Sequence, residues 1–251
     1  MKNVIYTCLT KGYDILQDPV EVSPDYDYVC FTDAPQEMSS RVWEFRPLPE
    51  EASPLLSSRR FKLLPHEVFE QYGYSIYMDA NIRIMSGEFY KAVGECIREG
   101  RLWTGVPHPA RDCVWDELKE CCLKGRIPLK GAFAVRKFLK DNPIPRHSGL
   151  LENNLIIRAH NDSSVRRLDE AWWEAFVKAP YRDQLCLYPL FSKFHVEPHL
   201  LFGNGTCARN TPVLQYSLHP GETVPKKGGT PFGPALLGLW RRCVAGFISR
   251  A

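Results

Sequence analysis

The sequence of 251 residues is short of the features that assign a chain to several common classes of protein. Nine cysteines are present, but no Cys-x-x-Cys pair occurs, so neither a disulfide framework nor a structural zinc site is indicated. No apolar run reaches the roughly 18 residues of a membrane-spanning helix. The net charge is only +3, which gives no support for a nucleic-acid partner, and we expect none.

A signal peptide is not expected from the first residues of the sequence. The first ten residues, MKNVIYTCLT, are strand-like and have neither the basic region nor the long apolar core of a signal peptide. Together with the irregular spacing of the cysteines, this predicts a cytoplasmic protein in a reducing compartment. The chain is, however, rich in apolar residues. Hydrophobic residues make up 44% and aromatic residues 12%, enough to bury a sizeable core.

Short runs of β-forming residues alternate with segments of helical spacing over the first 200 residues. Strands are predicted at 4–10, 26–33, 74–79 and 101–109 and within 149–161. Helices are predicted at 57–73, with Pro65 marking a kink or the helix start, at 88–100, at 115–124 within the charged segment 112–140, at 162–178 and at 182–194. This alternation indicates an α/β sheet whose strand ends face a ligand crevice. Residues 203–234 are rich in Gly, Pro, Asn and Thr and predict loop or linker, and 234–251 predict an apolar helix with interleaved basic residues.

The stretch YSIYMDANIRI (74–84) places a carboxylate and an amide inside a run of β-forming residues. A buried carboxylate is destabilising by several kcal/mol unless it is paired or binds a metal, so Asp79 requires a partner. Asp79 at a strand end, with the oxygen of Asn81 two residues later, suits Mg²⁺ or Mn²⁺. The alternative is a turn in which both side chains bond to their own backbone.

The chain carries six motifs in this order: YVCFTD (28–33), SRRFKLLPHEVF (58–69), YSIYMDANIRI (74–84), HPARDCVWDE (108–117), LLENNLIIRAHN (150–161) and RDQL (182–185). In order and spacing they resemble a glycosyltransferase-like family that was long classed as a domain of unknown function. Its members occur in bacterial polysaccharide loci and in plants, where they are linked to cell-wall pectin. The resemblance covers roughly residues 1 to 200.

The resemblance implies a fold and a domain division. The fold is α/β, a GT-A-like nucleotide-sandwich (Rossmann-like) mixed sheet flanked by helices. Residues 1–202 would form the catalytic domain, and 203–251 a loop-rich tail ending in an amphipathic helix. That helix has the profile of a segment that lies on a membrane surface or contacts a partner domain, which would place the protein at the inner face of the membrane. A helix packed on the body of the protein is the alternative.

The resemblance also implies a donor site for a nucleoside diphosphate sugar, linked to UDP or GDP, with Mn²⁺ or Mg²⁺ as cofactor. Asp79 matches the first residue of the DxD-type metal motif, and Asn81 takes the third place, where many GT-A enzymes have Asp. The donor-site candidates are Thr7, Thr10, Thr32, Asp33, Arg59, Arg60, Lys62 and Asp79. Asp33 suits a bond to the base or ribose, although it also suits a helix cap or turn. The three cations would neutralise the diphosphate, and a solvated basic face is their alternative.

Acceptor-side candidates follow from the later motifs. Substrate-binding residues are expected to be His108, Arg111, Asn153, Asn154 and Gln184. The alternatives are a turn at His108 and an ordinary loop at the two asparagines. Asp183 or Glu152 is the candidate general base for the acceptor hydroxyl, although Asp183 also suits a helix cap. The resemblance implies a late metal ligand from His195, His199 or His219, and a structural histidine is the alternative.

Two functions fit these residues. The first is a metal-dependent glycosyltransferase that transfers a sugar from a nucleotide donor to a carbohydrate or lipid-linked glycan acceptor in polysaccharide biosynthesis. The second is a non-catalytic GT-A-like module that binds sugar or nucleotide within a polysaccharide assembly. The presence of Asp79, Glu152 and Asp183 together favours the enzyme, whereas Asn81 in the place of Asp favours the binding module.

Overall fold

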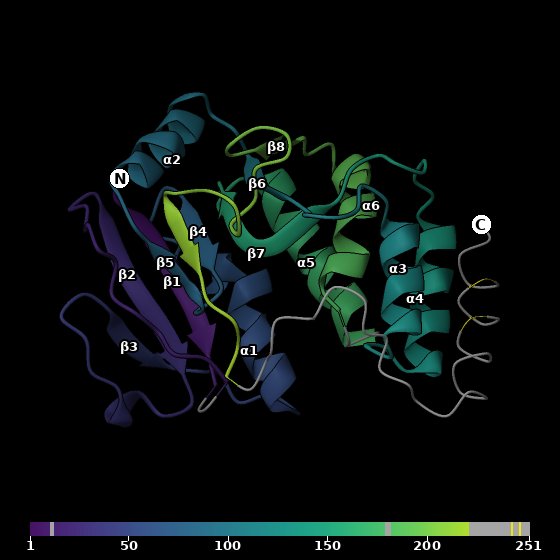
Figure 1. Ribbon diagram of the computed structural model, residues 1–251, viewed down its shortest axis with the longest axis horizontal. Coiled ribbons are helices and arrows are strands. Elements are labelled where there is room, and N and C mark those ends of the chain that lie inside the picture. Colours follow the sequence, from purple (N-terminus) through teal and green to yellow (C-terminus); the bar gives the residue numbers. More distant parts are fainter. Residues whose placement is uncertain (11–12, 179–181, 221–241, 243–245, 247–251) are drawn as a thin grey trace.

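A seven-stranded sheet forms the centre of the computed structural model, which describes residues 1–10, 13–178, 182–220, 242 and 246 (Figure 1). Its strand order is β3-β2-β1-β4-β7-β6-β8. The strands are β1 (Asn3–Leu9), β2 (Tyr26–Thr32), β3 (Glu44–Pro47), β4 (Ser75–Met78), β6 (Trp103–Pro107), β7 (Leu151–Arg158) and β8 (Pro198–Leu200).

Strand directions bring several chain segments to one edge of this sheet. The strands β3, β2, β1 and β4 are parallel to their neighbours, β7 is antiparallel to β4 and to β6, and β8 is parallel to β6. Every strand of the sheet except β7 therefore runs the same way. As a result, β1, β2, β4 and β6 end where β7 begins, and we call this the polar edge.

Helices cover both faces of the sheet (Figure 1). The first face packs against α1 (Pro54–Leu63), α5 (Ser163–Lys178) and α6 (Gln184–Phe194), with Trp103 and Trp172 at the centre of the core. On the opposite face lies α2 (Glu88–Arg98), whose apolar side is buried. Two further helices, α3 (Val114–Leu123) and α4 (Leu129–Asp141), form a third apolar cluster beside α6.

The structure confirms the predicted fold class and corrects the prediction in the late segment. The strand order and the helices on both faces are those of a mixed α/β sheet consistent with a GT-A-like fold. Residues 203–234 were expected to be loop or linker, yet β9 (Leu214–Tyr216) pairs with β5 (Ile82–Ile84) in a second, two-stranded sheet. Leu214 is buried in the core of the α2 face, and this burial holds the strand in place.

Two predicted boundaries were wrong. The helix expected at 57–73 begins at Pro54, where the Ser53 hydroxyl accepts from the Leu56 amide, and it ends at Leu63. Pro65 lies beyond this end and is neither a kink within α1 nor its start. Residues 65–67 form a short 3-10 helix instead. The polar residues 152–154, expected before the late strand, lie inside β7.

The division at residue 202 remains a prediction. The predicted C-terminal helix lies outside the described residues, apart from Arg242 and Gly246. No helix in the described part of the chain is long and apolar enough to span a membrane.

One fully buried ion pair ties the layers together. The Arg158 guanidinium at the end of β7 donates to Asp169 of α5 at 2.7 Å and to the Tyr6 hydroxyl of β1 at 2.9 Å. It also donates to the carbonyl of Lys62, in the last turn of α1. The Tyr6 hydroxyl donates in turn to the carbonyl of Phe61 at 3.0 Å. Carbonyls at a helix C-terminus have no partner within the helix, so these bonds fix where α1 ends.

We expect Arg158→Met to lower the free energy of unfolding by about 3–5 kcal/mol, because it leaves the Asp169 charge buried without a partner. Adding Asp169→Leu should recover part of the loss, since an apolar pair removes that unpaired charge. Urea denaturation measures both, with Arg98→Met as a control because the Arg98 side chain is 75% exposed. A double variant no more stable than Arg158→Met would contradict the account.

Candidate functional site

The polar edge gathers residues from distant parts of the sequence. Thr10 follows β1, Asp33 follows β2, Asp79 follows β4, and His108 follows β6. Because β7 runs in the opposite direction, Glu152 at its beginning lies at the same edge. Carboxyl ends of strands in open α/β sheets are where ligands bind. The topology therefore brings the donor and acceptor candidates of the sequence to one edge.

The partner that Asp79 requires is Lys62. The Lys62 ammonium lies 3.6 Å from Asp79 Oδ1 and 2.9 Å from Asp183 Oδ2, and the Lys62 side chain is only 3% exposed. The Tyr77 hydroxyl donates to Asp79 Oδ1 at 2.7 Å, and the ammonium lies 4.7 Å from the centre of the Tyr77 ring. One buried cation thus joins the end of β4 to the beginning of α6.

Arg59 and Arg60, the other two cations of the SRRFK motif, have different partners. Arg59 Nε lies 3.9 Å from Asp183 Oδ2 and belongs to the same charge cluster. Arg60 instead pairs with Glu51 at 2.6 Å and with Glu67 at 2.9 Å, away from Asp79 and Asp183. The solvated basic face that was the alternative for these cations therefore describes Arg60.

Asp183 is held by charge and by its backbone rather than acting as a helix cap. Its side chain makes no capping hydrogen bond, and its carbonyl accepts from the Trp172 indole at 2.8 Å. Burial alone would raise the pKa of Asp183, but the charges of Lys62 and Arg59 outweigh it and lower the pKa to about 2. A carboxylate with so low a pKa is a weak proton acceptor.

A bulge in β7 carries two buried amides to the polar edge. Gly105 pairs with Ile156, but the next residue of β6 pairs with Glu152, so residues 153–155 have no counterpart on β6. The Asp79 amide donates to the Asn154 carbonyl at 2.9 Å, which places the bulge beside Asp79. Asn153 and Asn154 are 6% and 4% exposed, and neither Asn153 Nδ2 nor the amide atoms of Asn154 have a hydrogen-bond partner. These amide groups are available to bond with a ligand or with ordered water.

One of the two carboxylate oxygens of Glu152 is bonded, and its partner comes from the segment that follows β8. Arg209 donates to Glu152 Oε1 from Nη2 at 2.5 Å and from Nε at 3.1 Å, while the buried Oε2 has no partner. The Arg209 guanidinium lies 3.7 Å from the centre of the Tyr216 ring in β9. A residue from the predicted tail thus contacts the candidate base.

His108, Arg111 and Gln184 bond to other groups of the protein itself. The amides of Ala110 and Arg111 donate to His108 Nδ1 at 3.2 and 3.0 Å, so His108 forms the turn that was its alternative. Burial, opposed by Glu117 but reinforced by nearby arginines, lowers the pKa of His108 to about 4 and leaves the ring neutral near pH 7. Arg111 pairs with the buried Glu117 at 2.5 Å. The Gln184 amide donates to the Leu151 carbonyl at 2.6 Å and joins α6 to β7.

Thr7 of β1 and Thr32 of β2, two of the donor-site candidates, differ in whether their hydroxyls already have a hydrogen-bond partner. Thr7 is buried and its hydroxyl has no hydrogen-bond partner. The Thr32 hydroxyl accepts from the Ala34 amide at 3.4 Å and lies 3.4 Å from Asp33 Oδ1, so it supports the turn after β2. Thr7 therefore has free hydrogen-bonding capacity near the polar edge, whereas Thr32 supports its own turn.

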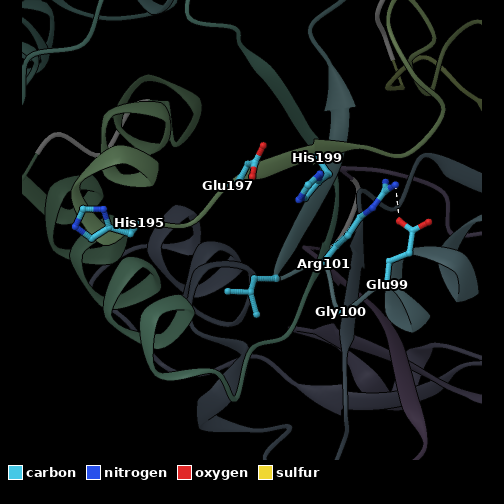
Figure 2. Close-up of a pocket in the computed structure, with 7 residues that line it drawn as sticks. Glu99, Gly100, Arg101, His195, Glu197 and His199 are labelled. Atoms are coloured by element: carbon cyan, nitrogen blue, oxygen red, sulfur yellow. Dashed lines mark ion pairs between the residues drawn. The ribbon is translucent and has the colours of Figure 1, made fainter.

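The three late histidines do not gather at the polar edge as one group. His219 pairs with Asp14 at 2.6 Å, in the loop that follows β1. His195 and His199 instead line a cavity of about 430 Å³ with Glu99, Arg101 and Glu197 (Figure 2). Arg101 lies two residues before the start of β6, so this cavity lies at the edge opposite the polar edge. His195 and His199 are thereby separated from Asp79.

The side chains around Asp79 offer few protein ligands to a divalent cation, and the Mn²⁺ or Mg²⁺ site remains a prediction. Within the described ranges, no group of three or more His, Cys, Asp or Glu side chains is placed to hold a metal ion. Asn81 donates from Nδ2 to the Ser217 carbonyl at 2.8 Å, and its buried Oδ1, which has no partner, contributes no charge. The Lys62 ammonium already occupies the neighbourhood of the Asp79 carboxylate and would repel a second cation.

Sequence reasoning missed Tyr77, Arg158 and Arg209. Arg158 had a usable signal, because a charge at the end of the apolar run LIIR demands a buried partner, as Asp79 does. Tyr77 read as an ordinary core aromatic, and nothing in the segment around Arg209 indicates that it contacts Glu152.

Comparison with known proteins finds similarity among solved structures only. No family model and no curated protein sequence matches the chain. Among solved structures, the chain is similar to an apo structure of WbbM, a bifunctional glycosyltransferase, with a TM-score of 0.44 and 11% sequence identity. The alignment covers 79% of this chain and 38% of that one, so this chain spans well under half of the WbbM structure. The fold described above rests on strand order and helix layers.

Acid should selectively destabilise the Lys62–Asp183 pair. Asp183 has a pKa of about 2 when folded against an ordinary value of 3.8, so between these pH values the unfolded chain binds more protons. Its stabilisation of about 2 kcal/mol is therefore present above pH 4 and lost as the pH falls toward 2.

Urea unfolding of the wild type and of Asp183→Asn across this range tests the assignment. The wild type should lose about 2 kcal/mol more than the variant between pH 5 and 2. Asp141→Asn, in an exposed helical ion pair, serves as the control and should follow the wild type. Parallel profiles for the wild type and Asp183→Asn would refute the prediction.

Proposed function

We propose that this chain is a glycosyltransferase that transfers a sugar from a UDP- or GDP-linked donor to a glycan or lipid-linked acceptor. The observation that carries the proposal is the cluster at the polar edge, where Lys62 and Arg59 meet Asp79 and Asp183 beside the unpartnered amides of the β7 bulge. Cations are what a diphosphate requires, and buried amides are what sugar hydroxyls bond to.

The donor diphosphate lies against the end of α1 in this proposal. Transfer breaks the bond between the anomeric carbon and the diphosphate oxygen, and negative charge develops on the leaving phosphate. Lys62 and Arg59 are held in place before the reaction, so they stabilise this charge without reorganising. A Mn²⁺ or Mg²⁺ ion on Asp79 and Asn81, which the family resemblance implies, would supply the same stabilisation but remains a prediction of the sequence.

Glu152 is the better of the two candidate bases. The acceptor oxygen attacks the anomeric carbon, and its proton must pass to a carboxylate with a free oxygen. Glu152 offers Oε2, which is buried and has no partner, while Arg209 orients the side chain through Oε1. Asp183 is tied to Lys62 and Arg59, so we assign it to positioning these cations. Asn153 and Asn154 would bind hydroxyls of the sugars.

The non-catalytic binding module remains the second candidate. This module is favoured because each candidate carboxylate already has a cationic neighbour. Lys62 lies beside Asp79 and Asp183, and Arg209 lies beside Glu152. Such a module would bind nucleotide but neither hydrolyse nor transfer the donor sugar. The enzyme and the module therefore differ in turnover and not in nucleotide binding. Release of nucleoside diphosphate from UDP- or GDP-sugars, with and without glycan acceptors, separates them.

Three variants test the roles. We expect Glu152→Gln to lower kcat by about 10²-fold or more with little change in donor binding, because it removes the proton acceptor. Asp79→Ala should lower transfer while the chain stays folded, because it removes one of the two carboxylates that hold the Lys62 ammonium in place, and Asp183→Asn should chiefly raise the donor KM. Glu88→Gln, with its exposed side chain on α2, is the matched control for Glu152→Gln.

Donor binding by calorimetry and transfer by chromatography give the required quantities. Full activity in Glu152→Gln would exclude Glu152 as the base. Full activity in Asp79→Ala would remove the cluster from the mechanism. Nucleotide binding without turnover under every condition would favour the binding module.

A further inference from the structure

We propose that Lys62 is itself the cation of the donor site, so that the diphosphate binds without a divalent metal. This inference rests on the proposed function and goes beyond it. It differs from the expectation raised by the Asp79–Asn81 motif, in which Mn²⁺ or Mg²⁺ takes this role.

The position of the Lys62 ammonium supports the proposal. It lies between the carboxylates of Asp79 and Asp183, at 3.6 and 2.9 Å, and faces the Tyr77 ring at 4.7 Å. Two carboxylates from different elements that converge on one buried point are an arrangement that otherwise attracts a divalent cation. Here that point is occupied by a side chain of the protein.

The charges of the cluster are already balanced. Asp79 and Asp183 supply two negative charges, and Lys62 and Arg59 supply two positive ones. Asn81, with an amide where a carboxylate would add a third negative charge, contributes none. A divalent cation would therefore enter a neutral cluster next to a fixed ammonium, whereas a diphosphate would meet two preplaced cations.

Lys62 is also held at the backbone. Its carbonyl accepts from Arg158, and that of the preceding residue, Phe61, accepts from the Tyr6 hydroxyl. Because both donors are buried, the last turn of α1 is anchored and the Lys62 side chain extends from a fixed point. A cation held in this way acts as a permanent part of the site, unlike a lysine on a solvated face.

The experiment compares metal and nucleotide binding in the full chain. In the wild type, UDP or GDP should raise the melting temperature equally in EDTA and in millimolar Mn²⁺, since binding to the native state alone stabilises it. Free Mn²⁺, followed by its electron paramagnetic resonance signal, should not be depleted by the wild type.

Lys62→Met should create a metal site. Without the ammonium, the cluster of Asp79, Asp183 and Arg59 has a net negative charge. The affinity for Mn²⁺ should therefore rise by about tenfold or more over the wild type. Adding Asp79→Asn to Lys62→Met should abolish this gain. Lys2→Met is the matched control, because it frees a single exposed carboxylate, Asp27, and should not gain Mn²⁺ binding.

Mn²⁺ binding by the wild type that is lost in Asp79→Asn would overturn the proposal, as would nucleotide stabilisation that disappears in EDTA. These measurements need no Lys62 variant, so they decide the question even if Lys62→Met does not fold. A folded Lys62→Met that gains no Mn²⁺ binding would also overturn it. Failure of UDP and GDP to bind under any condition would instead refute the glycosyltransferase proposal, while the Mn²⁺ titrations would still test the role of Lys62.

Discussion

Burial of the Arg158 guanidinium is the constraint on which the polar edge depends. A fully buried cation must be paired and hydrogen-bonded, and here its partners come from β1, α1 and α5. Satisfying them leaves a single arrangement for the end of α1. The side chain of Lys62 projects from that end, so the geometry of the charge cluster follows from an ion pair that contacts no substrate in the proposed mechanism.

Lys62 links this anchored helix end to the proposed donor site. Its backbone is held from inside the core, and its ammonium joins the end of β4 to the beginning of α6. An ammonium shared by two carboxylates, together with Arg59, leaves the cluster without net formal charge, which suits a site awaiting an anionic donor. The same neutrality makes the cluster a poor host for a divalent cation. One lysine thus connects the stability of the fold with the electrostatics of the proposed reaction.

Much of the fold was predictable because it follows from local patterns. Alternating apolar runs and helical spacing predicted most strands and helices, and polar residues at strand ends marked the polar edge, including Asp79 and Asp33. Glu152 and Asn154 were found as polar residues, but their place inside β7 was not, because a bulge depends on the register of two strands. The contacts of Arg209 with Glu152 and of Ser217 with Asn81 span more than 50 residues of sequence, beyond any local signal.

The sequence by itself placed Asp79 at the end of an apolar run and so predicted a partner for its carboxylate, which the structure leaves 32% exposed just after β4. It could not determine which partner, since a metal ion, an arginine and a lysine all satisfy that requirement equally well. Only the tertiary structure decided for Lys62, by anchoring the end of α1 on Arg158 and so bringing one ammonium between two carboxylates that lie 104 residues apart in the sequence.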